Sequence, residues 1–283
     1  MDGGWGAQMI DPLYVVARAA LLDALDAIGE QRDAVVLVGA QAIYLHTGDA
    51  DIAVPAFTTD GDLAIEPARL KAEPKLAEAM LSAHFRLGAQ PGSWLCERTV
   101  RGVATTIPID LMVPEAVAGA GRRAARLGDH GDRVGRRARG LEGALVDHRP
   151  LRLGALDPDD QRAFDIRVAG PSALLVAKLH KLAERTQEPE AKRLKDKDAL
   201  DVLRILRAIP INSLAEGLER LRTDSLSGEV TREAIAHLDT LFGSVSAAGT
   251  EMVIRATERL EDPAEIARSC ELLTTELLNA LRI

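Results

Sequence analysis

The sequence has little that would build a disulfide scaffold or a membrane anchor. Only two cysteines, Cys96 and Cys270, occur among the 283 residues, too few for a disulfide framework or a cysteine-rich zinc site. So few cysteines are typical of proteins in the reducing cytoplasm, where we expect this protein to reside. No run approaches the ~18 uninterrupted apolar residues of a membrane-spanning helix, and the first residues lack the pattern of a signal peptide. We therefore expect no membrane partner.

Aromatic residues are also scarce, at 3% of the chain, whereas apolar residues as a whole make up 47%. Ala, Leu, Val and Ile must therefore fill the core. The formal net charge is −8 at pH 7, so the chain as a whole does not attract polyanions. A nucleic-acid partner would need a local basic surface.

Hydrophobic spacing divides the chain into a mixed half and a helical half. Strand patterns occur at 35–38, 94–100 and 103–113, the last two joined by a plausible hairpin turn at Arg101-Gly102. Helical patterns occur at 12–28, 76–85, 171–187, 197–208, 212–222, 229–242, 249–260 and 263–281. We therefore predict an α+β fold with a mixed domain, 1–160, and a helical domain, 161–283.

A pair of carboxylates is the strongest chemical signal in the mixed half. The apolar run 35–38 ends at Gly39-Ala40, and Asp60-Gly61-Asp62 begins the next strand pattern. Side chains two positions apart on a strand share a face, so Asp60 and Asp62 should lie side by side. Their repulsion raises at least one pKa unless a cation shares the site. Mg²⁺ held by carboxylates and substrate phosphates removes that cost.

A third carboxylate, Asp110, lies on the strand pattern at 103–113, on the face opposite Ile109. A single aspartate on a half-buried strand is often just solvated. If this strand pairs beside the one carrying Asp60 and Asp62, however, three aspartates could hold one or two Mg²⁺ ions for phosphoryl or nucleotidyl transfer.

The first helices of the second half carry matched charges. Lys178, Lys181 and Arg185 share one helix face, and Asp198 and Asp201 share a face of the next helix. One interpretation is two amphipathic helices with solvated charges. The other is a cationic clamp for a triphosphate together with an acid that orients or deprotonates a nucleophile.

The stretch 120–152 is basic in an otherwise acidic chain, with nine arginines against four acids. It is either a solvated surface loop or a binding site for the phosphates of a nucleic acid or nucleotide. Because the stretch lacks aromatic residues for stacking, we do not expect it to read bases.

Taken in order, these motifs resemble the AbiEii-type nucleotidyltransferases, which include the Men-type toxins of bacterial toxin–antitoxin systems. The resemblance covers roughly 34–206 and implies a polymerase-beta-like nucleotidyltransferase core with a helical C-terminal domain. It also implies Mg²⁺, a nucleoside triphosphate as substrate, nucleotide addition to the 3′ end of tRNA that blocks translation, and a cognate antitoxin as partner. The RNA acceptor would then meet the Arg122–Arg139 stretch.

The resemblance assigns roles to particular residues. Asp60 and Asp62 match the metal-binding aspartates, and Asp110 matches the third strand carboxylate by position alone. Gly39 matches the glycine of the phosphate-binding turn, where Ala40 replaces the usual Ser or Gly and leaves only backbone N–H groups. The gap to Asp60 is longer than in minimal members, owing to a short insertion around 48–55.

In the helical half, Lys178 matches the lysine that meets nucleotide phosphates, and Asp198 matches the aspartate of a Lys-Asp-x-x-Asp segment. Lys181 and Arg185 would join Lys178 in binding the nucleotide. Two alternatives stay open beside an RNA-modifying toxin. One is nucleotidyl transfer to a small molecule or a protein hydroxyl, and the other is a non-catalytic binding protein with a degenerate site, which Ala40 would favour.

Overall fold

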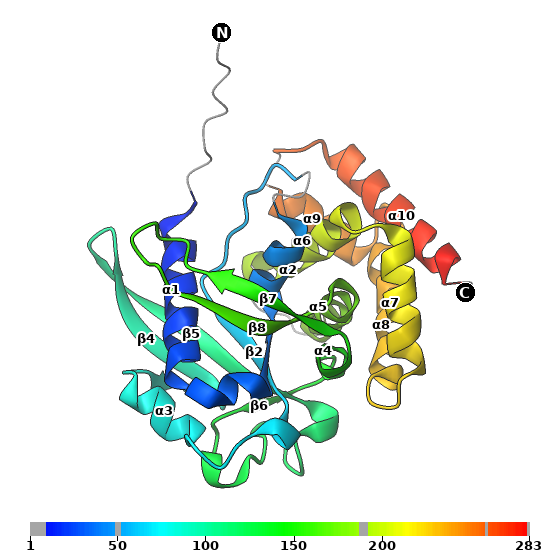
Figure 1. Ribbon diagram of the computed structural model, residues 1–283. Coiled ribbons are helices and arrows are strands. Elements are labelled where there is room, and N and C mark those ends of the chain that lie inside the picture. The colour runs from blue at the N-terminus through cyan, green and yellow to red at the C-terminus, as the bar shows by residue number, and fades with distance from the viewer. Residues whose placement is uncertain (1–9, 49–51, 187–191, 258–259, 282–283) are drawn as a thin grey trace.

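The computed structural model describes residues 10–48, 52–186, 192–257 and 260–281, with side chains in the third range from 196 onward. It consists of one twisted sheet, helices on both of its faces, and a group of helices that packs beside it (Figure 1). Within the described residues no helix is both long and apolar enough to cross a bilayer.

Eight strands of the described chain form a single mixed sheet in the order β3-β4-β5-β2-β1-β8-β7, with β6 paired to β5 off this path. The strands are β1 (Val35–Val38), β2 (Gly61–Ile65), β3 (Arg86–Leu87), β4 (Ser93–Val100), β5 (Val103–Pro114), β6 (Arg136–Ala138), β7 (His148–Gly154) and β8 (Ala163–Ala169). β2 runs parallel to β5, and β1 runs parallel to β8 but antiparallel to β2.

The helices of the sheet half are α1 (Pro12–Ala27), α2 (Gly39–Thr47), α3 (Leu76–Ser82) and α4 (Glu142–Val146). Those that follow are α5 (Pro171–Thr186), α6 (Lys192–Ala208), α7 (Ile211–Thr223), α8 (Gly228–Phe242), α9 (Ala248–Ala256) and α10 (Pro263–Ala280). The start of α10 shows why the sequence marks it: Asp262 accepts a hydrogen bond from Ala264 N at 2.8 Å, and Pro263 occupies the first turn.

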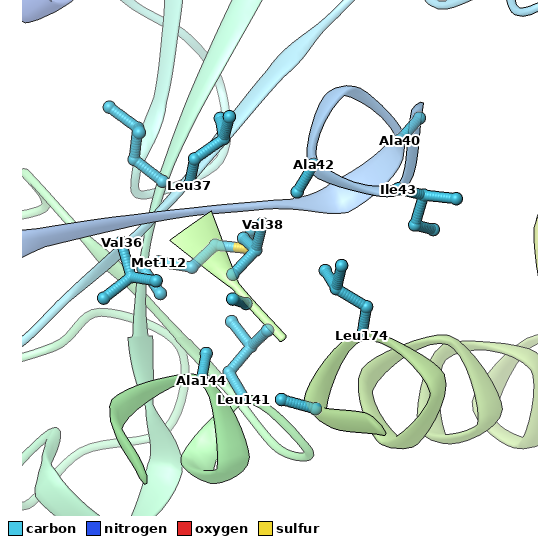
Figure 2. Packing of buried hydrophobic residues seen from close by; sticks show 14 of the residues in the cluster. Val36, Leu37, Val38, Ala40, Ala42, Ile43, Met112, Leu141, Ala144 and Leu174 are labelled. Carbon is cyan, nitrogen blue, oxygen red and sulfur yellow. The ribbon is translucent and has the colours of Figure 1, made fainter. Parts of the chain in front are cut away.

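The two faces of the central strands have different surroundings. A side chain at Gly61 would lie 2.9 Å from Ile109 of β5 and 3.2 Å from Leu21 of α1, so this face of β2 and β5 is covered by α1. On the other face, Val38 and Met112 lie in the core with Leu141 and Leu174, from the starts of α4 and α5 (Figure 2). Alternation along β2 therefore turns Asp62 toward α5.

The structure confirms most of the predicted elements. The hairpin turn at Arg101-Gly102 joins β4 to β5, with Val100 paired to Val103. The expected boundary at 160/161 does not follow the sheet, because β8 lies beyond it and pairs with both β1 and β7. The expected basic loop is also wrong for much of 120–152, since β6, α4 and most of β7 fall within it. Part of the predicted insertion, 49–51, lies outside the described residues.

Candidate active site

Backbone pairing brings the predicted carboxylates together at one end of the central strands. Asp62 is paired with Val38 of β1 on one side and with Asp110 of β5 on the other. Paired residues on neighbouring strands project to the same face, so Asp62 and Asp110 stand beside each other. Asp60 lies two residues earlier, directly before β2, and its charge acts on Asp62.

Burial raises the pKa of Asp62 to about 7, and the negative charges of Asp60 and Asp110 add to this rise while Lys181 and Lys178 oppose it. Only 8% of Asp62 is exposed. A buried carboxylate beside two others is costly without a cation, which is the donor chemistry that suits Mg²⁺. No three acidic, histidine or cysteine side chains in the described ranges already converge as a metal cluster. Asp60 and Asp62 alone therefore fit an ion that takes its other ligands from water and substrate phosphates.

Asp110, the predicted third metal ligand, is engaged by an arginine of β6. Arg136 Nη2 donates to Asp110 Oδ2 at 2.9 Å and lies 3.1 Å from Met112 Sδ. To bind a metal ion, Asp110 would have to give up its ion pair with Arg136 or bind both at once. Its role as a metal ligand therefore stays a prediction. This pairing could not be predicted from local sequence patterns, because 26 residues separate the two partners.

The glycine turn fits directly over Asp62. Gly39 has φ of +70°, and a Cβ atom there would stand 2.0 Å from Asp62 Oδ2. The close approach explains why glycine follows β1, since any side chain would displace the carboxylate. Ala40 is 5% exposed, so its methyl group belongs to the core and its backbone N–H is what a ligand can reach.

Replacing Gly39 by Ala should abolish activity and destabilise the protein, because the new methyl group collides with Asp62 and the backbone is in the left-handed region. Gly48→Ala is the control, since Gly48 has φ of +54° but, among the described residues, no neighbouring atom within 4 Å of an added Cβ. It should cost about 1–3 kcal/mol, the backbone penalty alone, and leave activity intact. Thermal unfolding and activity of both variants measure this. Equal effects of the two substitutions would show that contact with Asp62 is unimportant.

Lys178 is held inside a buried ion-pair cluster. Its Nζ lies 2.6 Å from Asp198 Oδ1 and 2.7 Å from Asp201 Oδ2, and all three side chains are less than 10% exposed. Burial lowers the pKa of Lys178, but the two carboxylates outweigh it and raise that pKa well above its ordinary value. The phosphate contact that the resemblance implies for Lys178 stays a prediction, because the structure gives its ammonium two carboxylate partners.

Asp198 also gathers the other predicted cations of α5. Lys181 Nζ lies 3.4 Å from Asp198 Oδ1, and Arg185 Nη1 bonds Asp198 Oδ2, so the expected common face is confirmed. Burial raises the pKa of Asp198, but Lys178, Lys181 and Arg185 outweigh it and hold that pKa well below its ordinary value. Such a carboxylate is a poor proton acceptor at neutral pH, so the geometry favours the orienting role over that of a base.

Three buried residues that sequence reasoning missed hold Asp60 in place. Thr58 Oγ1 donates to Asp60 Oδ1, and Gln41 Nε2 donates to the Asp60 carbonyl at 2.7 Å. Arg18 Nε in turn donates to Gln41 Oε1 at 2.6 Å. Gln41 lies on α2, two residues after Gly39, so one helix start positions both the glycine turn and Asp60. Arg18 and Gln41 lie within apolar helical segments, and polar groups that are buried need hydrogen-bond partners. Their presence there was the sequence signal that could have indicated these contacts.

A pocket of about 640 Å³ opens over this site. It is lined by the site residues Gly39, Asp62, Lys178, Lys181 and Arg185, by the β6 region and by residues of α8. Arg136 and Arg137 line its cationic side, and the Nε of each is buried without a hydrogen bond within the described chain. Guanidinium groups near the carboxylate of Asp62 suit a metal-bound polyphosphate.

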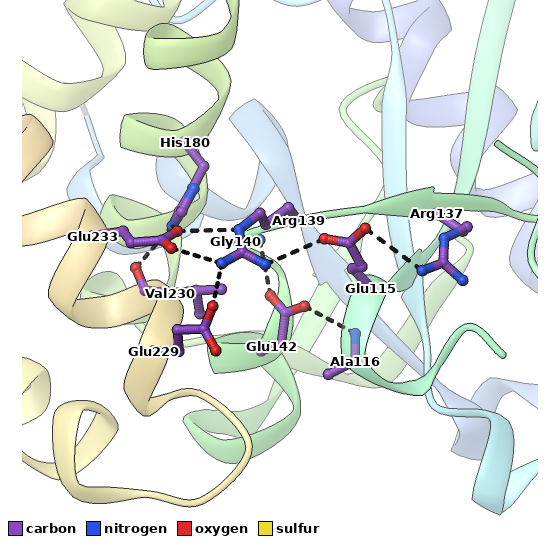
Figure 3. A network of polar contacts seen from close by, with 10 residues as sticks. All are labelled: Glu115, Ala116, Arg137, Arg139, Gly140, Glu142, His180, Glu229, Val230 and Glu233. Carbon is purple, nitrogen blue, oxygen red and sulfur yellow. Dashed lines mark hydrogen bonds and ion pairs between the residues drawn. The ribbon is translucent and has the colours of Figure 1, made fainter. Parts of the chain in front are cut away.

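The other arginines between 122 and 139 divide into two groups. Arg137 and Arg139 are tied internally to Glu115, and Arg139 also bonds Glu229 and Glu233 of α8 (Figure 3). Arg122, Arg123, Arg126 and Arg133 are exposed, and Arg122 lies on the rim of the pocket.

Comparison with protein families matches residues 17–208 to a family described as Nucleotidyltransferase. The match includes the glycine turn, the three aspartates, Lys178 and the Asp198–Asp201 segment. Neither the search of curated proteins nor that of solved structures finds a match.

Proposed function

Because the chain belongs to the nucleotidyltransferase family, we propose that it is a Mg²⁺-dependent toxin that transfers a nucleoside monophosphate from a nucleoside triphosphate to RNA, at the 3′ end of tRNA. The observation that carries the transfer chemistry is the buried Asp62 under the Gly39 turn, with Asp60 two residues before it on the chain, in a pocket with cationic walls. The block of translation and a cognate antitoxin complete the proposal and follow from the resemblance of the motifs.

In this reaction Asp60 and Asp62 would hold Mg²⁺, which when bound would neutralise phosphate charge. The backbone N–H groups after Gly39 point from the start of α2 toward the phosphates. Lys181, 38% exposed, is the cation of α5 best placed to contact them. Asp198 fixes Lys178 and Lys181, and Arg136 orients Asp110 beside the reacting groups.

The choice of acceptor is tested by incubating the protein with Mg²⁺, total RNA and each labelled triphosphate separately. Label in the tRNA band, absent with Asp62→Asn, is the expected result. Label in a small molecule or in protein would support the alternative acceptors. No label with any triphosphate would contradict the transferase proposal.

The exposed arginines supply the support for an RNA acceptor. Net charge is −8, so a polyanionic acceptor is repelled at long range unless a local basic surface offsets the repulsion. Arg122, Arg123 and Arg126 are exposed, and Arg122 lies at the pocket, so these residues offer such a surface beside it.

Replacing Arg122, Arg123 and Arg126 together by Ser should raise the Michaelis constant for RNA about tenfold or more and flatten its dependence on salt, because each lost phosphate contact reduces counterion release. The Michaelis constant for the triphosphate should change little. The control changes Arg152, Arg220 and Arg268 to Ser, which removes the same charge from exposed sites elsewhere. Wild-type salt dependence in the first variant would show that RNA binds elsewhere or is not the acceptor.

A further inference from the structure

The pocket has two ends of opposite charge. At the end that holds Asp62, the cations of α5 and β6 surround the site of the phosphates. The other end is formed by Glu233 and His237 of α8, which packs against α5 on the side away from the sheet (Figure 1). There Arg139 lies 2.7 Å from both Glu229 and Glu233 and 3.3 Å from Glu115. Glu115 is shared with Arg137, so three carboxylates face two guanidinium groups and leave a net negative charge, which repels phosphate.

Apolar residues also line the pocket, namely Val38, Met112, Leu141, Leu174 and Ala177. An apolar lining suits the faces of a nucleobase, and the charged ends allow one orientation. A nucleotide with its phosphates over Asp62 would point its base toward α8.

Arg139 fixes the carboxylate of Glu233 at the end of the pocket where the edge of that base would lie. Arg139 binds both of its oxygens, with Nη2 at 2.7 Å from Oε1 and Nε at 3.1 Å from Oε2 (Figure 3). Hydrogen bonding to Arg139 lowers the pKa of Glu233, so the group is ionised at neutral pH and only accepts hydrogen bonds. Each carboxylate oxygen has a further lone pair free after its bond to Arg139. His180, whose Nε2 donates to Val230 O at 2.8 Å, packs edge-on against His237 and fixes this wall.

Resting on the proposed function, we infer that Glu233 accepts a hydrogen bond from the exocyclic amino group of the nucleobase. The site then selects triphosphates of adenine, cytosine or guanine over uracil. Uracil carries carbonyl oxygens where the other bases carry the amino group, and an oxygen facing an ionised carboxylate is repelled.

The test measures binding of non-hydrolysable ATP, CTP, GTP and UTP analogues with Mg²⁺ by calorimetry. Glu229→Gln is the matched control for Glu233→Gln, because Glu229 also bonds Arg139 from α8 but does not line the pocket. Wild type and Glu229→Gln should bind the best amino-bearing analogue about tenfold or more tightly than the UTP analogue. In Glu233→Gln the ratio should fall to about threefold or less, because an amide also donates.

The outcomes separate the two proposals. A wild-type preference for the UTP analogue, or selectivity that Glu233→Gln leaves unchanged, would overturn the inference while triphosphate binding stands. Failure of the wild type to bind any analogue would overturn the transferase proposal and the inference with it. Thermal unfolding of each variant confirms that it is folded, as expected for a glutamate whose side chain is 39% exposed.

Discussion

Asp62→Asn should abolish nucleotidyl transfer, by about 10³-fold or more, and yet make the metal-free protein more stable at pH 7.5. Activity is lost because one of two metal-holding carboxylates is gone. Stability rises because the wild-type side chain is buried beside Asp60 and Asp110, with a pKa raised to about 7. An amide of the same shape carries no charge to bury.

The same pKa fixes the pH dependence of stability. Between about pH 4 and pH 7 the folded protein keeps a proton on Asp62 that the unfolded chain releases, so the free energy of unfolding falls as pH rises through this window. The full effect is up to about 4 kcal/mol, from about 1.4 kcal/mol for each pKa unit. Asp62→Asn should remove this slope and the stabilisation that added Mg²⁺ gives the wild type.

Thermal unfolding from pH 4 to pH 8, with and without Mg²⁺, measures both effects. Asp165→Asn is the control, because Asp165 is 72% exposed on neighbouring β8. It should leave activity and the pH profile unchanged. Full transfer activity in Asp62→Asn would remove the metal-site proposal, and an unchanged pH profile would show that Asp62 is ionised in the metal-free protein.

Lys178→Met should destabilise the protein by about 3–5 kcal/mol, because it leaves Asp201 buried without its ion-pair partner. Asp201 is 1% exposed, with Lys178 at its Oδ2 and the Tyr44 hydroxyl 3.5 Å from its Oδ1. For a chain of this size such a loss corresponds to roughly 10 °C or more in Tm. Adding Asp201→Asn to Lys178→Met should restore much of the stability by removing the unpaired charge, without restoring transfer.

Lys181→Met is the matched control on the same helix face. Lys181 is 38% exposed and shares Asp198 with two other cations, so its loss should change stability by less than about 1 kcal/mol. It should instead weaken triphosphate binding about tenfold. If Lys181→Met leaves triphosphate affinity intact while folded Lys178→Met loses it, the phosphate contact belongs to Lys178, as the motif resemblance implies.

The sequence predicted the elements whose side chains repeat with a clear period. The strand at 35–38 is predicted because it is a short continuous apolar run, and the strand at 103–113 and the helices after Pro171 because one side of each is apolar. Asp62 and Asp110 could be placed on faces by alternation, and their pairing in register confirms that β5 lies beside β2. By contrast, β6 has three residues and no apolar side, so it resembled a loop.

Contacts between distant segments could not be read from periodicity. The sequence showed cations on one face of α5 and acids on one face of α6, but not that these faces meet with Lys178 between Asp198 and Asp201. Likewise, Gln41 gave no sign that it bonds the backbone of Asp60 and the side chain of Arg18. These interactions depend on which helices become neighbours, and that is decided by the packing of the whole core.

The place of β8 in the sheet restricts how this fold can be divided. β8 follows the basic stretch and leads directly into α5, yet it separates β7 from β1 in the sheet. A chain ending at residue 160 would leave β1, four buried apolar residues, as an unprotected edge that can recruit strands from other molecules. The sheet and the helices that follow it are therefore not exchangeable modules. Recombination between relatives should preserve function only where the crossover lies after β8, so that the sheet is inherited whole.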